Sequence, residues 1–285
     1  MQVRANAWLA PAKLNLFLHI LGRREDGYHE LQTLFQLLDV GDTLRFAATP
    51  RGELQLHLIA NSTGQLVPLA DNLILEAARL LRDHVGNPQL GAEIQLEKQL
   101  PMGGGLGGGS SNAATTLLAL NQLWELGLTR QELQALGLQL GADVPVFIGG
   151  RSAWGEGVGE KLEPVELPTR WYLVITPNCL VSTARIFGHE DLTRNTRAIK
   201  MADFLAGRGQ NDCEKVTRLL YPQVENALQW LDQRAPARMT GTGGSVFAVF
   251  PDRFEAERIL ATLPNEWRGF VARGIDKLEH DFQQA

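Results

Sequence analysis

Cysteine and clustered metal ligands are both scarce in this chain of 285 residues. Only two cysteines occur, Cys179 and Cys213, and they are well separated. This argues against a disulfide framework and indicates a reduced compartment, in which each cysteine is a small buried hydrophobic residue. The six histidines are scattered without the spacing of metal ligands, so the sequence predicts no metal-binding residues.

Basic charge and long apolar runs are also lacking. The chain has 27 Lys and Arg against 32 Asp and Glu, a net charge of −5, which argues against nucleic-acid binding. No apolar run is long enough to cross a membrane, and the N-terminus lacks a basic-then-apolar signal pattern. We therefore expect a soluble, cytoplasmic protein with neither nucleic acid nor membrane as a partner.

Glycine, in contrast, is concentrated in one place. Six of the seven residues from Gly103 to Gly109 are glycine, Ser110 and Ser111 follow, and a helical pattern begins at Asn112. Ordering so many glycines is costly, because each loses more backbone freedom than any other residue. Backbone N–H groups at a helix N-terminus bind phosphate well, so this run predicts a phosphate-binding loop.

The flanks of the glycine run are regular. Residues 92–100 alternate between apolar and polar as in a half-buried strand, and residues 113–124 bring apolar groups to one helical face. Ser110 or Ser111 is the expected N-cap, and Gly127 the expected stop. The pattern predicts a strand–loop–helix unit and disfavours a flexible linker.

Other phosphate loops match less well. The run contains no lysine and ends in Gly-Ser-Ser, unlike the Gly-Lys-Ser/Thr ending of the common nucleotide hydrolases. The His-Arg-Asp and Asp-Phe-Gly motifs of protein kinases do not occur. A dinucleotide loop can be traced through the glycines, but its ribose-binding residue would fall inside the following helix.

The rest of the chain mixes helical and strand patterns, which favours an α+β fold with one large or two intimate domains. Residues 41–60 alternate like the strands of a meander, and Thr129 with Glu132 forms a capping box. Further strands are expected at 14–21, 173–176 and 246–250, and further helices at 71–84, 224–233 and 255–263.

Two residues offer the chemistry of phosphoryl transfer. Lys13 enters the first strand, and Asp143 lies between a predicted helix and an apolar segment. An aspartate accepts the proton of an acceptor hydroxyl, and a lysine beside it stabilises the negative charge. From the residues alone, a solvated lysine and a turn aspartate are equally good interpretations. Tyr28 and His29 suit base recognition, although such a pair is more often ordinary packing.

Three blocks together carry a family resemblance: Pro11–Leu18, Leu100–Ala114 and Thr240–Phe247. The chain resembles the galacto-, homoserine, mevalonate and phosphomevalonate (GHMP) kinases. Residues 23–35 and 140–147 are similar, more narrowly, to the 4-diphosphocytidyl-2-C-methyl-D-erythritol kinase family of the non-mevalonate isoprenoid pathway. One mild departure is Gly244-Ser245, where other small residues are expected.

The resemblance implies two lobes, residues 1–162 for ATP binding and catalysis and residues 163–285 as an α+β lobe, with the site between them. It implies that Lys13 and Asp143 are the catalytic pair, and that ATP and Mg²⁺ are required. The implied ATP cradle is Pro101, Met102, Gly103, Gly104, Gly105, Leu106, Gly107, Gly108, Gly109, Ser110 and Ser111. The implied acceptor-binding residues are Asn15, Tyr28, His29, Phe187, Gly241, Thr242 and Gly243.

The implied partners are small molecules, ATP and a cytidine-diphosphate-linked polyol, bound by a monomer or weak homodimer. Two alternatives stay open: a kinase for another small alcohol such as mevalonate or homoserine, and a non-catalytic ligand sensor on the same fold. Tyr28 and His29 argue against the first, because those alcohols have no base to stack. The presence of both Lys13 and Asp143 argues against the second.

Overall fold

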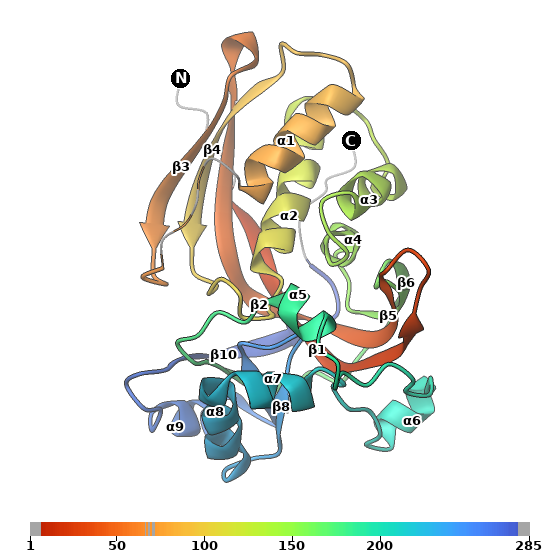
Figure 1. The fold of residues 1–285 in the computed structure, drawn as a ribbon. Helices are drawn as coiled ribbons and strands as arrows, with labels where there is room; N and C mark the ends of the chain where they lie inside the picture. The colour runs from red at the N-terminus through yellow and green to blue at the C-terminus, as the bar shows by residue number, and fades with distance from the viewer. Residues whose placement is uncertain (1–6, 66, 68, 70–71, 279–285) are drawn as a thin grey trace.

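The computed structural model describes residues 7–65, 67, 69 and 72–278. Asp71, where one predicted helix was expected to begin, lies outside this part of the chain. Figure 1 shows two stacked halves, the upper one built mainly from the N-terminal part of the chain and the lower one mainly from the C-terminal part. Helices and strands of one mixed sheet occur in both halves, which confirms the α+β class.

The elements of the N-terminal part begin with two long strands. They are β1 (Trp8–Arg23), β2 (His29–Thr49), the 3₁₀ turn η1 (Pro50–Gly52), β3 (Leu54–Asn61), α1 (Leu73–His84), β4 (Gly91–Lys98), α2 (Gly108–Leu123), α3 (Arg130–Leu138), α4 (Val144–Gly149), β5 (Ala153–Gly157) and β6 (Lys161–Pro164).

The elements of the C-terminal part are shorter. They are β7 (Trp171–Thr176), α5 (Thr183–Phe187), α6 (Met201–Leu205), α7 (Glu214–Leu220), α8 (Pro222–Asp232), β8 (Ala237–Met239), β9 (Val246–Phe250), α9 (Arg253–Leu260) and β10 (Arg268–Ile275).

Strand β2 joins the two halves. It pairs with β1, β4 and β5 of the N-terminal part and with β10 of the C-terminal part. The sheet order is β3-β4-β2-β10-β7-β9-β8. The predicted meander over 41–60 is therefore wrong in its pairing: β2 continues to Thr49, and β3 pairs in parallel with β4 rather than with β2. Alternation specifies which face of a strand is buried, but not which neighbour it joins.

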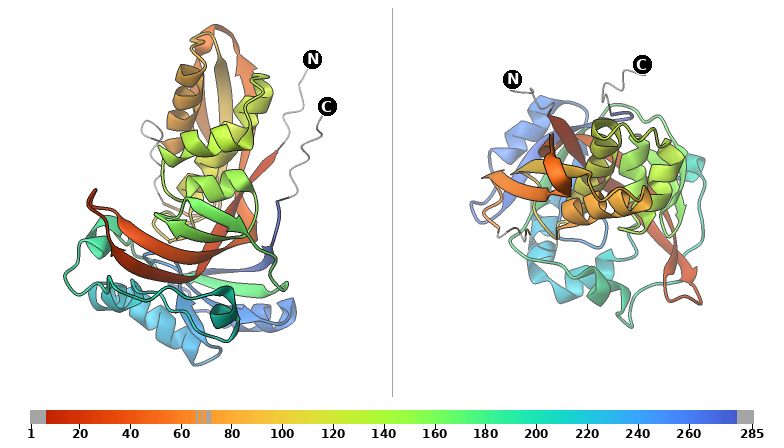
Figure 2. Two further views of the ribbon diagram at one scale, coloured as in Figure 1. Left: turned by 90° about the vertical axis from the view of Figure 1, so that its right-hand side faces the viewer. Right: turned by 90° about the horizontal axis from the view of Figure 1, so that it is seen from above.

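Three groups of buried side chains hold these layers together. One packs α1 to α4 against β2, β3 and β4, and a second packs α7, α8 and α9 against β7 and β9. The third lies between them and includes Phe17, Leu100, Leu106 and Phe247. Leu106 of the glycine run is buried in this third group, so hydrophobic packing fixes the loop at the junction of the halves. The layers can be followed in Figure 2.

Several predicted elements are confirmed where the chain is described. The side chain of Asn72 caps α1 by accepting from Ile74 N, and the Thr129–Glu132 capping box begins α3. The predicted strands at 173–176 and 246–250 correspond to β7 and β9, and the helices at 224–233 and 255–263 to α8 and α9. In the part of the chain that the structure describes, no helix has the length and apolarity needed to cross a bilayer.

Candidate active site

A cavity of about 540 Å³ lies beneath the glycine run. Among the residues predicted for the site, those that line it are Lys13, Asn15, Pro101, Met102, Gly103, Gly104, Gly105, Leu106, Gly107, Gly108, Gly109, Ser110, Asp143, Phe187, Gly241 and Thr242. Tyr28, His29, Ser111 and Gly243 were also predicted and are not among its lining residues.

Lys13 and Asp143 meet in this cavity. Lys13 Nζ lies 3.0 Å from Asp143 Oδ2, and the exposed fractions of the two side chains are 4% and 33%. The Lys13 residue sits in β1, where its backbone N–H donates to Leu106 O of the glycine run at 3.0 Å. Asp143 immediately precedes α4, and this places a partly exposed carboxylate beside a buried ammonium.

Asn15 connects this pair to both halves of the molecule. Lys13 Nζ donates to Asn15 Oδ1 at 2.6 Å, and Asn15 Nδ2 donates to Thr33 Oγ1 at 2.8 Å. The Asn15 backbone N–H donates to Thr240 Oγ1 at 2.8 Å. A buried polar group must be hydrogen-bonded, and these contacts leave the lysine with a fixed direction.

The glycine run adopts a backbone that few other residues accept. Gly103, Gly105 and Gly107 have φ of 67°, 73° and 71°. The expected N-cap at Ser110 or Ser111 is wrong: α2 begins at Gly108, and Gly107 is the N-cap, in the left-handed region. Glycine reaches this region without steric strain, so the loop turns sharply, and no side chain caps the first N–H groups of α2.

The block from Thr240 to Ser245 braces the glycine run from the C-terminal half. Ser245 N donates to Gly104 O at 3.0 Å. A Cβ on Gly105 would lie 2.5 Å from Thr240 O, and one on Gly241 would lie 3.2 Å from Gly105 O. The two glycine segments therefore touch backbone to backbone, which a larger residue at Gly105 would prevent.

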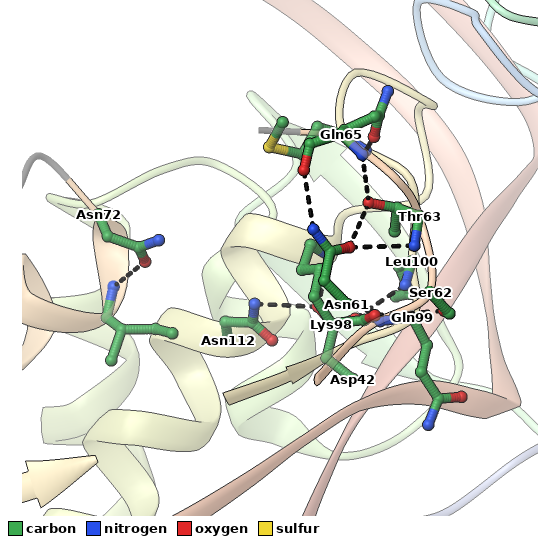
Figure 3. Close-up of polar contacts among 12 residues, drawn as sticks. Asp42, Asn61, Ser62, Thr63, Gln65, Asn72, Lys98, Gln99, Leu100 and Asn112 are labelled. Carbon is green, nitrogen blue, oxygen red and sulfur yellow. Dashed lines mark hydrogen bonds and ion pairs between the residues drawn. The ribbon is translucent and has the colours of Figure 1, made fainter. Parts of the chain in front are cut away.

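A second charged pair lies under the loop and was missed from the sequence. Asp42 is fully buried and accepts hydrogen bonds from Lys98 Nζ at 2.6 Å, Gln99 N at 2.7 Å, Leu100 N at 2.8 Å and Asn112 Nδ2 at 3.0 Å. Figure 3 shows these side chains converging from β2, the end of β4 and α2. The carboxylate therefore ties the start of the glycine run to the first turn of its helix.

Lys98 is part of the site. It lines the cavity, although only 5% of its side chain is exposed. Burial lowers the pKa of Lys98, while the nearby Asp42 carboxylate opposes that shift. One signal was available: Lys98 falls on the same face of the alternating strand as Ile94 and Leu96, which are buried. The partner Asp42 carried no such signal.

The loop after β3 forms another edge of the cavity region. Asn61 Oδ1 accepts from Thr63 N at 3.0 Å and from Thr63 Oγ1 at 2.6 Å, and Gln65 N donates to Thr63 Oγ1 at 3.1 Å. Gln65 Oε1 in turn accepts from Met102 N at 2.7 Å. These bonds connect the loop to the first residues of the glycine run.

Two of the three residues predicted to recognise a base, His29 and Phe187, are in contact with each other. His29 is buried and stacks on Phe187, with ring centroids 5.0 Å apart and planes inclined by 28°. Tyr28, the residue before His29, is 64% exposed. Phe187 lines the same cavity as Lys13 and Asp143, and His29 reaches it only through its contact with the Phe187 ring.

Two family models match the chain, "GHMP kinases N terminal domain" over residues 72–151 and "GHMP kinases C terminal" over residues 191–269. A 4-diphosphocytidyl-2-C-methyl-D-erythritol kinase of Pseudomonas aeruginosa is 58% identical, with 93% of this chain and 92% of that protein covered. One from Shewanella loihica is 54% identical, with 96% and 95% covered.

A solved structure of a 4-(cytidine 5'-diphospho)-2C-methyl-D-erythritol kinase has a TM-score of 0.76 and 32% identity, and the match covers 94% of this chain and 99% of that one. The chain belongs to the 4-diphosphocytidyl-2-C-methyl-D-erythritol kinase family. The family resemblance found in the sequence is thereby confirmed, and membership makes this protein an ATP-dependent GHMP kinase that acts on a small molecule.

Proposed function

We propose that this protein transfers the γ-phosphoryl group of ATP to the 2-hydroxyl of 4-diphosphocytidyl-2-C-methyl-D-erythritol, a step of the non-mevalonate isoprenoid pathway. The names and identities of its relatives support the substrate. The observation that carries the chemistry is the 3.0 Å contact between Lys13 and Asp143 in a cavity roofed by the glycine run.

In the proposed reaction, the acceptor oxygen attacks the γ-phosphorus. A new oxygen–phosphorus bond forms, the bond to the β-bridging oxygen breaks, and ADP leaves with that electron pair. Asp143 accepts the hydroxyl proton, since its carboxylate is the partly exposed one of the pair. Lys13, held by Asn15, stabilises the negative charge around the transferring group.

The glycine run would cradle the ATP phosphates through its backbone N–H groups and the N-terminus of α2. Mg²⁺ accompanies ATP in kinases and neutralises phosphate charge. The site fits such an ion: among the described residues that line the cavity, Asp143 is the one carboxylate, and Mg²⁺ takes few protein oxygens besides phosphate oxygens. The ATP phosphates would hold the ion, near the Asp143 carboxylate and without taking its place as proton acceptor.

The cytidine end of the acceptor would lie at Tyr28, His29 and Phe187. The stacking of the His29 imidazole on Phe187, a ring that lines the cavity, supports this placement, and Tyr28 is the residue before His29 in the chain. We also propose the lobe boundary after residue 162, a cytoplasmic location and a monomer or weak homodimer.

A kinase assay with purified protein tests this function. ADP production is measured with 4-diphosphocytidyl-2-C-methyl-D-erythritol, bare methylerythritol, mevalonate and homoserine in parallel. We expect turnover with the cytidylylated acceptor alone. Preference for mevalonate or homoserine would favour the first alternative, and ligand binding without turnover would favour the sensor.

A further inference from the structure

The guanidinium of Arg194 fastens the segment after α5 to the start of β2. Its Nε–H donates to Nε2 of His29 at 3.1 Å. Its terminal nitrogens donate to the carbonyl oxygens of Phe187 at 2.8 Å, His189 at 2.8 Å and Leu192 at 3.1 Å. Four bonds from one planar group fix its orientation, and with it the direction of the Nε–H bond.

This contact determines which nitrogen of His29 carries the proton. Arginine keeps all its N–H protons and can only donate, so Nε2 of His29 must accept through its lone pair. A neutral imidazole with an unprotonated Nε2 carries its proton on Nδ1. Burial, and then the charges of Arg194 and Arg23, lower the pKa of His29, which keeps the ring neutral.

The Nδ1–H group that results is available to a ligand. No hydrogen bond of His29 Nδ1 is found among the residues that the structure describes. The ring is buried and packed on Phe187, and the carbonyl of Phe187 is itself held by Arg194. One side chain therefore sets both the direction of a free donor and the place of the neighbouring ring.

We propose that Arg194 is a positioning residue that holds His29 as the Nδ1–H tautomer, so that this proton is donated to the base of the acceptor substrate. The inference rests on the proposed function, which places the cytidine end at His29. N3 of cytosine is a hydrogen-bond acceptor, whereas N3 of uracil carries a proton. A fixed Nδ1–H donor consequently favours cytosine over uracil and contributes to substrate choice.

The tautomer is tested first, in the ligand-free full-length protein. The ¹⁵N spectrum of histidine-labelled protein separates protonated from unprotonated ring nitrogens, and His29→Gln identifies the His29 signals. We expect a protonated Nδ1 and an unprotonated Nε2. In Arg194→Met we expect a mixture of both tautomers and a higher pKa. Arg197→Met removes an exposed charge from the same segment and should leave the His29 signals unchanged.

Kinetics then test the consequence. Loss of one charge-assisted hydrogen bond is expected to raise the KM for the cytidylylated acceptor about tenfold in Arg194→Met. The KM for ATP should stay within about twofold, and the preference for the cytidine acceptor over its uridine analogue should fall. Arg194→Lys, which keeps a cationic donor, should recover part of the acceptor KM.

Three results would overturn the inference. They are an Nε2–H tautomer in the parent, an unchanged tautomer with an unchanged acceptor KM in Arg194→Met, and a loss of thermal stability that raises both KM values alike. A parent protein that does not turn over the cytidylylated acceptor contradicts the proposed function instead, and the ¹⁵N spectrum still decides whether Arg194 sets the tautomer.

Discussion

Lys13 Nζ and Asp143 Oδ2 lie 3.0 Å apart, with the lysine buried in β1 and the carboxylate partly exposed at the start of α4. The lysine also donates to Asn15 and packs 5.6 Å from the centre of the Phe35 ring. These contacts hold the Lys13 ammonium in one position. The Asp143 carboxylate is the more accessible member of the pair and the natural proton acceptor.

Replacing this carboxylate should stop turnover and spare ATP binding. Asp143→Asn keeps the shape of the side chain but cannot accept the proton, so kcat should fall by ~10²–10⁴-fold. Steady-state kinetics and ATP titration measure the two effects. Asp83→Asn, the same change on an exposed side chain of α1, serves as the control. Activity of Asp143→Asn within a few-fold of the parent would refute the base assignment.

Gly108 is the best position at which to test the phosphate cradle. A Cβ there would meet Leu100 Cβ and Lys98 Nζ at 3.4 Å, which is ordinary contact, and the residue has no positive φ. Gly108→Ala should therefore fold but hold phosphate oxygens away from the N–H groups, raising the ATP KM by roughly 10- to 100-fold for one lost charge-assisted bond.

Two other glycines serve as controls for this variant, one disruptive and one neutral. Gly105→Val should also lose stability, because its Cβ would lie 2.5 Å from Thr240 O at a φ of 73°. Gly22→Ala, with nothing within 4 Å, should behave as the parent. If folded Gly108→Ala binds ATP normally, the phosphates lie elsewhere.

Tyr28→Ala should harm the acceptor selectively. Removing a stacking ring typically costs ~1–3 kcal/mol per base, so the acceptor KM should rise by roughly one to two orders of magnitude. The ATP KM and the melting temperature should change little, since the Tyr28 side chain is 64% exposed. Tyr28→Phe keeps the ring and should retain the acceptor KM. An unstable Tyr28→Ala variant with both KM values raised would mean that the ring only packs the strands.

Stability should fall in mildly acidic solution because of His19. Burial lowers the pKa of His19 below its ordinary value of 6.5, although Asp212 opposes the shift, and His19 Nε2 accepts from Gln210 N at 3.2 Å. Below pH 6.5 the unfolded chain binds a proton that the folded protein excludes. The unfolding free energy should therefore decrease as the pH falls from 6.5 toward the lowered pKa, by at most about 1.4 kcal/mol per pH unit for this group.

Urea denaturation at a series of pH values measures this slope. His19→Gln retains an acceptor for Gln210 N and should reduce the slope, while His29, whose pKa is also lowered, supplies the remainder with the same sign. An identical slope in the parent and in His19→Gln would exclude His19 as a source.

Local patterns predicted much of this molecule. The alternation of 92–100 and the capping box at Thr129 depend on neighbours a few residues away, and both appear in the structure as expected. The family blocks directed attention to Lys13 and Asp143, and the structure brings these two side chains together.

Contacts between residues far apart in the chain could not be predicted from the sequence. The pairing of β3 with β4 depends on where the chain passes after η1, and no residue of β3 encodes that path. Asp42 meets Lys98 only once β2 and β4 are paired. Arg194 lies in a polar stretch without periodicity, and its partner His29 begins a strand in the other half of the chain.

The position of the transferred phosphate tests the central claim most directly. The product formed from ATP and 4-diphosphocytidyl-2-C-methyl-D-erythritol is examined by ³¹P NMR without proton decoupling. C2 bears a methyl group and no hydrogen, so a 2-phosphate gives a monophosphate signal without coupling to a proton on the bonded carbon. We predict that uncoupled signal, with one ADP formed per phosphate transferred. A proton-coupled monophosphate, or ADP formed without phosphorylated acceptor, would contradict it.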